Sequence, residues 1–135
     1  GRKLREASYG KAKDLSAWKA RVAQAWTEVK VLNVEGDVNA ADLGEERSVV
    51  ASVQIGSLST KDISVQLAHG RVGASGELND PTFAEMEPVD NDNGTCTYRG
   101  SFTASDTGLY GYAVRVVPSH EDLANPMNLG LIAWA

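Results

Sequence analysis

The chain has 135 residues, of which 42% are hydrophobic and 23% are charged, and its formal net charge is −5. These values are typical of one ordinary globular domain that can bury a sizeable core, and they argue against a disordered chain. Residues 1–30 carry a net charge of +5 and the remainder −10, and an acidic body disfavours nucleic acids and anionic membranes as partners.

The single cysteine, Cys96, excludes an intrachain disulfide and a cysteine-based metal site. We expect it to be a small buried hydrophobe on a strand. The N-terminus has no apolar segment of the signal-peptide type, and no apolar run approaches the ~20 residues that span a bilayer. The sequence therefore favours a soluble intracellular protein.

An amphipathic helix is predicted from Lys11 to Thr27, a segment without proline or glycine. Its apolar residues share one face at 3.6 residues per turn, and they are Leu15, Trp18, Val22, Ala25 and Trp26. Two tryptophans on this face predict that the helix covers a large apolar surface. The preceding segment Arg2–Tyr9 is also compatible with a helix, broken at Gly10.

After Trp26 the hydrophobic period changes from 3.6 to 2, which is typical of strands. About seven short strands are expected, near residues 29–34, 49–55, 63–67, 83–86, 95–99, 110–116 and 131–134. The run Asp90–Gly94 is interpreted as a hairpin turn, because the glutamate that closes a calcium loop is missing. No helical pattern separates the strands, so an antiparallel sandwich or barrel remains.

The motif Asp106-Thr107-Gly108-Leu109-Tyr110-Gly111-Tyr112 narrows this choice. In immunoglobulin-like sandwiches a tyrosine near the start of the penultimate strand turns its hydroxyl back onto upstream backbone. We predict that Tyr110 is this largely buried tyrosine corner. The predicted fold class is therefore mostly β, an immunoglobulin-like antiparallel β-sandwich of about seven strands with an N-terminal amphipathic helix. The expected division is a linker helix over 1–28 and a sandwich over 29–135.

No constellation predicts catalysis, cofactor binding or metal binding. His69 and His120 are far apart in the sequence, and each is expected to serve a loop rather than to act as a base or ligand. No nucleophile elbow, phosphate loop or dinucleotide loop is present. Trp18, Trp26 and Trp134 are interpreted as packing residues, with sugar stacking as the alternative. The predicted structural residues are therefore Tyr110 and these three tryptophans.

The C-terminal run Gly111–His120, followed by Leu123–Pro126 and Leu129–Ala135, closely resembles the carboxyl end of bacterial α-glucan (glycogen) phosphorylases, especially those of actinobacteria and many thermophiles. Val65–Val72 is similar to an upstream strand and turn of that family, and Leu15–Val22 to the linker helix after its catalytic body. The resemblance covers essentially the whole chain. It implies a cytoplasmic glycosyltransferase that cleaves α-1,4-glucan with orthophosphate to give glucose 1-phosphate, using pyridoxal phosphate held on a lysine.

The motif around that lysine has no counterpart in this sequence, so the resemblance transfers no catalytic residue. It implies a non-catalytic C-terminal accessory domain without a cofactor of its own, whose partner is the catalytic body of the parent enzyme. Two alternatives stay open. One is a carbohydrate-binding module that raises the local concentration of α-glucan, and the other is a homo-oligomerisation module that uses an exposed sheet edge.

Overall fold

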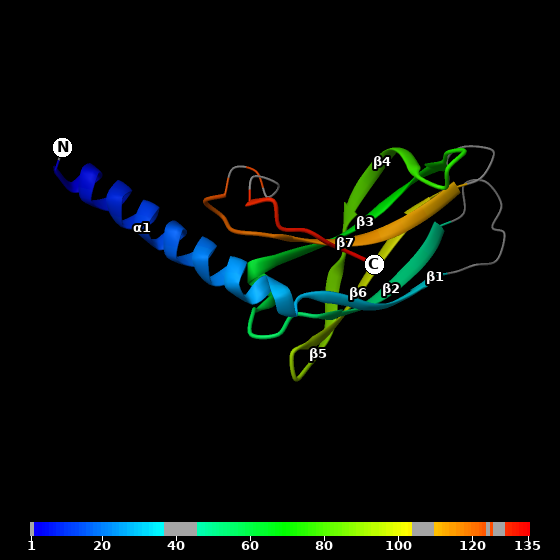
Figure 1. Ribbon diagram of the computed structural model, residues 1–135, viewed down its shortest axis with the longest axis horizontal. Helices are drawn as coiled ribbons and strands as arrows, with labels where there is room; N and C mark the ends of the chain where they lie inside the picture. The colour runs from blue at the N-terminus through cyan, green and yellow to red at the C-terminus, as the bar shows by residue number, and fades with distance from the viewer. Residues whose placement is uncertain (1, 37–45, 104–109, 124, 126–128) are drawn as a thin grey trace.

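The computed structural model describes residues 2–36, 46–103, 110–123, 125 and 129–135. Within them one long helix precedes two packed sheets (Figure 1). The helix α1 is followed by a 3₁₀ turn η1, and a second turn η2 precedes β3. The elements are α1 (Arg2–Ala25), η1 (Trp26–Glu28), β1 (Lys30–Gly36), β2 (Glu46–Gln54), η2 (Thr60–Asp62), β3 (Ile63–Val72), β4 (Leu78–Glu85), β5 (Glu87–Asp92), β6 (Thr95–Thr103), β7 (Tyr110–Pro118) and β8 (Ala133–Trp134).

The strands form two antiparallel four-stranded sheets, ordered β1-β2-β6-β5 and β4-β3-β7-β8. In the strand letters of immunoglobulin domains these orders read A-B-E-D and C′-C-F-G. The prediction of an immunoglobulin-like sandwich with an N-terminal helix is thus confirmed. The position of β7, next to the last strand, also matches the place of the strand that carries the tyrosine corner.

The core lies between the inner faces of the two sheets. Burial alternates along β2, where Val49, Ala51 and Val53 point inward, because successive side chains of a strand point to opposite faces. The other inward residues follow the same period, and the most buried among them are Val65, Leu67, Cys96, Tyr98, Phe102, Val114 and Val116. Cys96 is free and fully buried, as its sequence setting predicted.

Three details differ from the sequence expectations. Helix α1 is continuous through Gly10, so the predicted break is wrong. Strand β5 was missed because all six of its residues are exposed and no apolar alternation marks it. The turn after it is tighter than expected, with only Asn93 and Gly94 between the strands, and both have positive φ (47° and 82°). Asn-Gly is the residue pair that favours this two-residue hairpin.

Helix α1 projects from one end of the sandwich, and its N-terminus lies far from the sheets (Figure 1). With 24 residues it is about 36 Å long at 1.5 Å per residue. No described helix combines the length and apolar composition needed to cross a membrane. The helix contacts the sandwich near its C-terminal end, where Trp18 and Val22 are buried.

Candidate functional site

The junction between α1 and the sandwich is organised around one carboxylate, Asp62. This residue ends the turn η2, where it forms a capping box with Ser59, and Ser59 N donates to its Oδ2 at 3.0 Å. Trp18 Nε1 donates to Asp62 Oδ1 at 2.9 Å. Arg21, one turn further along the same helix face, donates to both carboxylate oxygens at 3.2 and 3.3 Å. Donors from the helix and from the sandwich thus converge on a single side chain.

The pKa of Asp62 is lower than its ordinary value. Burial by itself would raise this pKa, but the hydrogen bonds from Ser59, Trp18 and Arg21 and the charge of Arg21 outweigh the burial. The carboxylate is therefore ionised near neutral pH. An ionised acceptor strengthens each hydrogen bond that holds the helix.

Trp18 and Trp26 both lie at this junction, but their indole nitrogens differ. The Trp18 ring is 7% exposed and contacts the ring of His120 at a centroid distance of 4.7 Å. His120 lies in the loop after β7, and its Nδ1 accepts a hydrogen bond from Asp122 N at 3.0 Å. Trp26 lies in η1 and packs against the core, and its buried Nε1 has no hydrogen-bond partner among the described residues.

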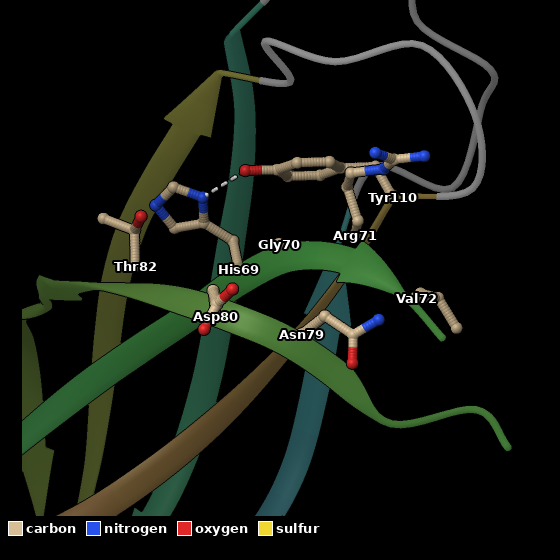
Figure 2. A pocket seen from close by; sticks show the side chains of 8 residues that line it. All are labelled: His69, Gly70, Arg71, Val72, Asn79, Asp80, Thr82 and Tyr110. Carbon is tan, nitrogen blue, oxygen red and sulfur yellow. Dashed lines mark hydrogen bonds between the residues drawn. The ribbon is translucent and has the colours of Figure 1, made fainter. Parts of the chain in front are cut away.

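A cleft of about 500 Å³ lies at the opposite end of β3, beside the start of β7 (Figure 2). The β3–β4 register shifts between His69 and Arg71, and at Gly70 an added Cβ would approach Asn79 O to 3.1 Å. Asp80 has a positive φ of 44°, an uncommon conformation for a residue other than glycine. The lining residues are His69, Gly70, Arg71, Val72, Asn79, Asp80, Thr82 and Tyr110.

His69 and Tyr110 meet at the rim of this cleft (Figure 2). His69 Nδ1 lies 2.8 Å from the Tyr110 hydroxyl oxygen, and the imidazole stacks on Phe102 at 5.1 Å. Burial lowers the pKa of His69, so the ring is neutral near pH 7. No described carboxylate bonds to His69 to orient it as a general base. The described residues of the cleft thus offer polar groups for binding. His69 lies within β3, so its predicted loop position is wrong.

Tyr110 is half-buried at the beginning of β7, less buried than expected. Its hydroxyl partner His69 is a side chain on a neighbouring strand. The upstream backbone of the predicted tyrosine corner, residues 106–109, lies outside the described residues. The backbone hydrogen bond of that corner therefore stays a prediction.

Trp134 differs from the other two tryptophans because it is 49% exposed on β8. It lies on the outer face of the β4-β3-β7-β8 sheet, beside Arg115, its register partner on β7. The Arg115 guanidinium carbon is 3.6 Å from the ring centroid of Phe83 and 5.8 Å from that of Trp134. Arg115 Nε also donates to Gln66 Oε1 at 2.7 Å. The expectation that Trp134 is simply a packing residue does not describe this position.

Sequence reasoning singled out neither Asp62 nor the pair Phe83 and Arg115. A signal for Asp62 was present, because Ser59-Thr60-Lys61-Asp62 has the capping-box spacing. No local signal marks the other pair. Phe83 and Arg115 come from strands 32 positions apart in sequence, and only the pairing of β4 and β7 with β3 brings them together.

The four lysines whose side chains are described lie at the surface. Lys13, Lys30 and Lys61 are exposed and Lys19 is half-buried on the helix surface. A lysine that holds pyridoxal phosphate lies in a site that encloses the cofactor and pairs with its ring nitrogen. The described lysines do not fit such a site.

The fold defines an immunoglobulin-like β-sandwich domain preceded by a long helix. The sequence model of the glycogen phosphorylase C-terminal domain family matches residues 26–135. The chain is 31% identical over 137 residues to a glycogen phosphorylase of Mycobacterium tuberculosis, covering 99% of this chain and 16% of that protein. It is 25% identical over 135 residues to a maltodextrin phosphorylase of Thermococcus litoralis, covering 97% of this chain and 15% of that protein.

One solved structure, an alkylpurine DNA glycosylase of Pseudomonas fluorescens bound to DNA containing an abasic-site analogue, aligns with 67% of this chain and 27% of its own. Its TM-score is 0.44 at 16% identity. The family match covers most of the chain. The protein therefore belongs to the glycogen phosphorylase C-terminal domain family, and it spans about one sixth of the length of the phosphorylases that it matches.

Proposed function

We propose that this chain is the non-catalytic C-terminal domain of an α-glucan phosphorylase, joined to the catalytic body by the linker helix of residues 1–28. The sandwich of residues 29–135 acts as an accessory domain fixed to that helix. The family match and the names of the two relatives support the proposal, as does the small share of those relatives that the chain spans.

The contact of helix α1 with Asp62 is the observation that carries this proposal. A connector between two independently moving domains needs no buried hydrogen bond to either of them. Here Trp18 and Arg21 both bind the carboxylate, and the Trp18 ring is almost fully buried. A displacement of the helix would consequently carry the sandwich with it, which suits a domain held in a fixed place on a larger enzyme.

The parent enzyme in this proposal is cytoplasmic and phosphorolyses α-1,4-glucan to glucose 1-phosphate. Its pyridoxal phosphate belongs to the catalytic body, because the described lysines of this chain do not fit the cofactor. The proposed partner of this chain is that body. Neither nucleic acid nor membrane is a proposed partner.

The direct test compares this chain with the complete protein that contains it, each incubated with maltodextrin and phosphate. The complete protein should release glucose 1-phosphate, and the 135-residue chain should release none, with or without added pyridoxal phosphate. Release by the chain above a boiled control would contradict the accessory role. Lack of release by the complete protein would contradict the phosphorylase assignment.

The fixed attachment has its own test in the complete protein. Asp62→Ala should increase protease cleavage near residues 25–30, because the helix loses its acceptor on the sandwich, whereas Asp90→Ala on the exposed strand β5 should not. Equal cleavage of both variants would contradict a rigid junction. Light scattering of the same proteins tests the alternative of a homo-oligomerisation module, which requires a dimer or larger assembly that forms through this domain.

A further inference from the structure

The outer face of the β4-β3-β7-β8 sheet carries two large aromatic side chains that remain open to solvent. Phe83 on β4 is 41% exposed and Trp134 on β8 is 49% exposed. Arg115 lies against both rings, so the two rings are neighbours on one surface. We call Phe83, Arg115 and Trp134, with Gln66 beneath them, the aromatic face. Exposed aromatic groups gathered at one place mark interaction sites more often than scattered apolar residues do.

Arg115, the central side chain of the aromatic face, is held in place by its neighbours. Arg115 Nε donates to Gln66 Oε1 at 2.7 Å, and its guanidinium carbon lies 3.6 Å from the Phe83 centroid. Gln66 Nε2 in turn donates to Ser64 Oγ at 3.4 Å. The terminal nitrogens of Arg115 make no hydrogen bond within the described residues, so they are available as donors at a fixed position. A preorganised donor loses little entropy when a ligand arrives.

A carboxylate lies on the same side of the sheet as this guanidinium. Gln66 is the register partner of both Arg115 and Glu85, which places the three on one face. Glu85 Oε1 accepts from Ser64 Oγ at 2.6 Å. One positive and one negative side chain give the surface no net charge. Such a surface suits a neutral ligand with many hydroxyl groups better than it suits a phosphate or an acidic peptide.

These features together fit a sugar chain. The C–H side of a glucose ring can stack on an exposed aromatic ring, while guanidinium and carboxylate groups hydrogen-bond its hydroxyls. We propose that the aromatic face is an accessory binding surface for an α-1,4-glucan, separate from the site of phosphorolysis. This inference rests on the proposed function for the choice of glucan. Binding one part of a branched polymer here would raise the local concentration of its other chain ends near the catalytic body.

The catalytic body of the same protein is the competing occupant of this surface. The cores of protein–protein interfaces are depleted in charged residues, whereas Arg115 lies at the centre of the aromatic face with Glu85 on the same side of the sheet. Hydrogen bonds link the side chains of Glu85, Ser64, Gln66 and Arg115. At a dry interface the partner would also have to supply hydrogen-bonding groups for these side chains. Sugar hydroxyls can match them and remain partly hydrated.

The test uses the complete protein with Trp134→Ala and, separately, Phe83→Ala. The matched control is Leu32→Ala, because Leu32 is 52% exposed on β1 of the other sheet. Trp134→Phe serves as the rescue variant, since it keeps an aromatic ring at the position. Each protein is sedimented with glycogen without phosphate. Its KM and kcat are then measured for glycogen and for maltopentaose, which is too short to reach both sites.

We expect Trp134→Ala to weaken glycogen binding about tenfold, the loss typical of a central aromatic contact. Phe83→Ala should act in the same direction, and Leu32→Ala should bind like the unchanged protein. The KM for glycogen should rise with the dissociation constant, while the KM for maltopentaose and both kcat values stay constant. Trp134→Phe should recover most of the binding.

Two results would overturn the inference. One is glycogen binding by Trp134→Ala and Phe83→Ala that equals binding by Leu32→Ala. The other is a lower melting temperature of the catalytic body in both variants, which would mean that the catalytic body packs on the aromatic face. Failure of the proposed function is distinguishable, since it appears as absent glucose 1-phosphate release by the unchanged protein. Sedimentation with glycogen needs no turnover and decides the binding question in either case.

Discussion

Two regions of this domain combine a tryptophan with an arginine, and they use the pair in opposite ways. At the helix junction Trp18 is 7% exposed, and its indole nitrogen and Arg21 both donate to Asp62. On the aromatic face Trp134 is 49% exposed, and Arg115 lies between its ring and that of Phe83. At the junction the polar groups of Trp18, Arg21 and Asp62 are paired with one another, whereas the aromatic face keeps arginine donors and ring surface available.

This difference predicts how each region responds to mutation. Removing a buried, paired group takes away packing and leaves a desolvated partner, and the folded state becomes less stable. Removing a half-exposed group changes little in the folded state, because water already covers much of it. The junction should therefore govern stability, and the aromatic face should govern binding.

The largest effect is expected for Trp18→Ala. A buried tryptophan of this kind contributes about 3–5 kcal/mol when the cavity left behind does not collapse, and the change also leaves Asp62 without its indole donor. Urea unfolding of the 135-residue chain measures the free energy of unfolding. A loss below about 1 kcal/mol would mean that the junction does not hold the helix, and the comparison between the two regions would fail.

Asp62→Asn should have the next largest effect. The amide keeps the size of the side chain but removes the charge that Arg21 and the Ser59 N–H group bind. We expect a loss of about 1.5–3 kcal/mol, the range for hydrogen bonds to charged groups. Asp92→Asn on the exposed strand β5 is the control and should change the urea midpoint little.

The same carboxylate predicts the direction of a pH effect. The pKa of Asp62 is lowered in the folded state, so the unfolded chain takes up the proton first as the pH falls. The stabilisation is fully present above the ordinary aspartate pKa of about 4 and is lost as the pH drops through the lower folded value. Acid titration of stability should be shallower in Asp62→Asn than in the unchanged chain. Identical titrations would contradict this assignment.

Tyr110→Phe tests a third, intermediate environment. The hydroxyl bonds to His69 at 2.8 Å, and the tyrosine is half-buried. Loss of one such hydrogen bond costs about 1 kcal/mol, less than the change at Trp18. A larger loss, near 3 kcal/mol, would favour the second bond to upstream backbone that a tyrosine corner requires. An unchanged urea midpoint and slope would exclude both.

Much of the fold could be predicted because it depends on local periodicity. The alternation along β2 and the 3.6-residue period of α1 follow from which side each residue buries. Along β3 and β7 the apolar residues of the inner face, such as Val65, Leu67, Val114 and Val116, still recur every second position. Strand β5 could not be predicted in this way, since it is a fully exposed edge strand with Asp90, Asn91 and Asp92 in it. Its pairing with β6, rather than its own composition, makes it a strand.

The candidate sites were less predictable for a related reason. Trp18 stands out in the sequence as a helical core position, but its partner Asp62 is 44 residues away. Trp134 has an apolar neighbour in Ile132, which suggested packing. Its exposure depends on where β8 lies at the edge of the sheet, beyond β7. The periodicity of the side chains indicates which residues share one face of a strand. Whether other parts of the protein cover that face depends on where the strand lies in the assembled sheets.

Trp134→Ala should have the smallest effect on stability, and this result completes the comparison with Trp18. The ring is already half exposed, and a cation–π contact at an exposed site contributes about 0.5–1 kcal/mol. Urea unfolding of Trp134→Ala and Trp18→Ala under the same conditions should thus differ by at least about 2 kcal/mol. If Trp134→Ala instead destabilised the chain as much as Trp18→Ala, Trp134 would be a structural anchor of β8. Any loss of glycogen binding in that variant would then follow from local unfolding, so a small change in stability is what allows the binding experiment to report on the surface itself.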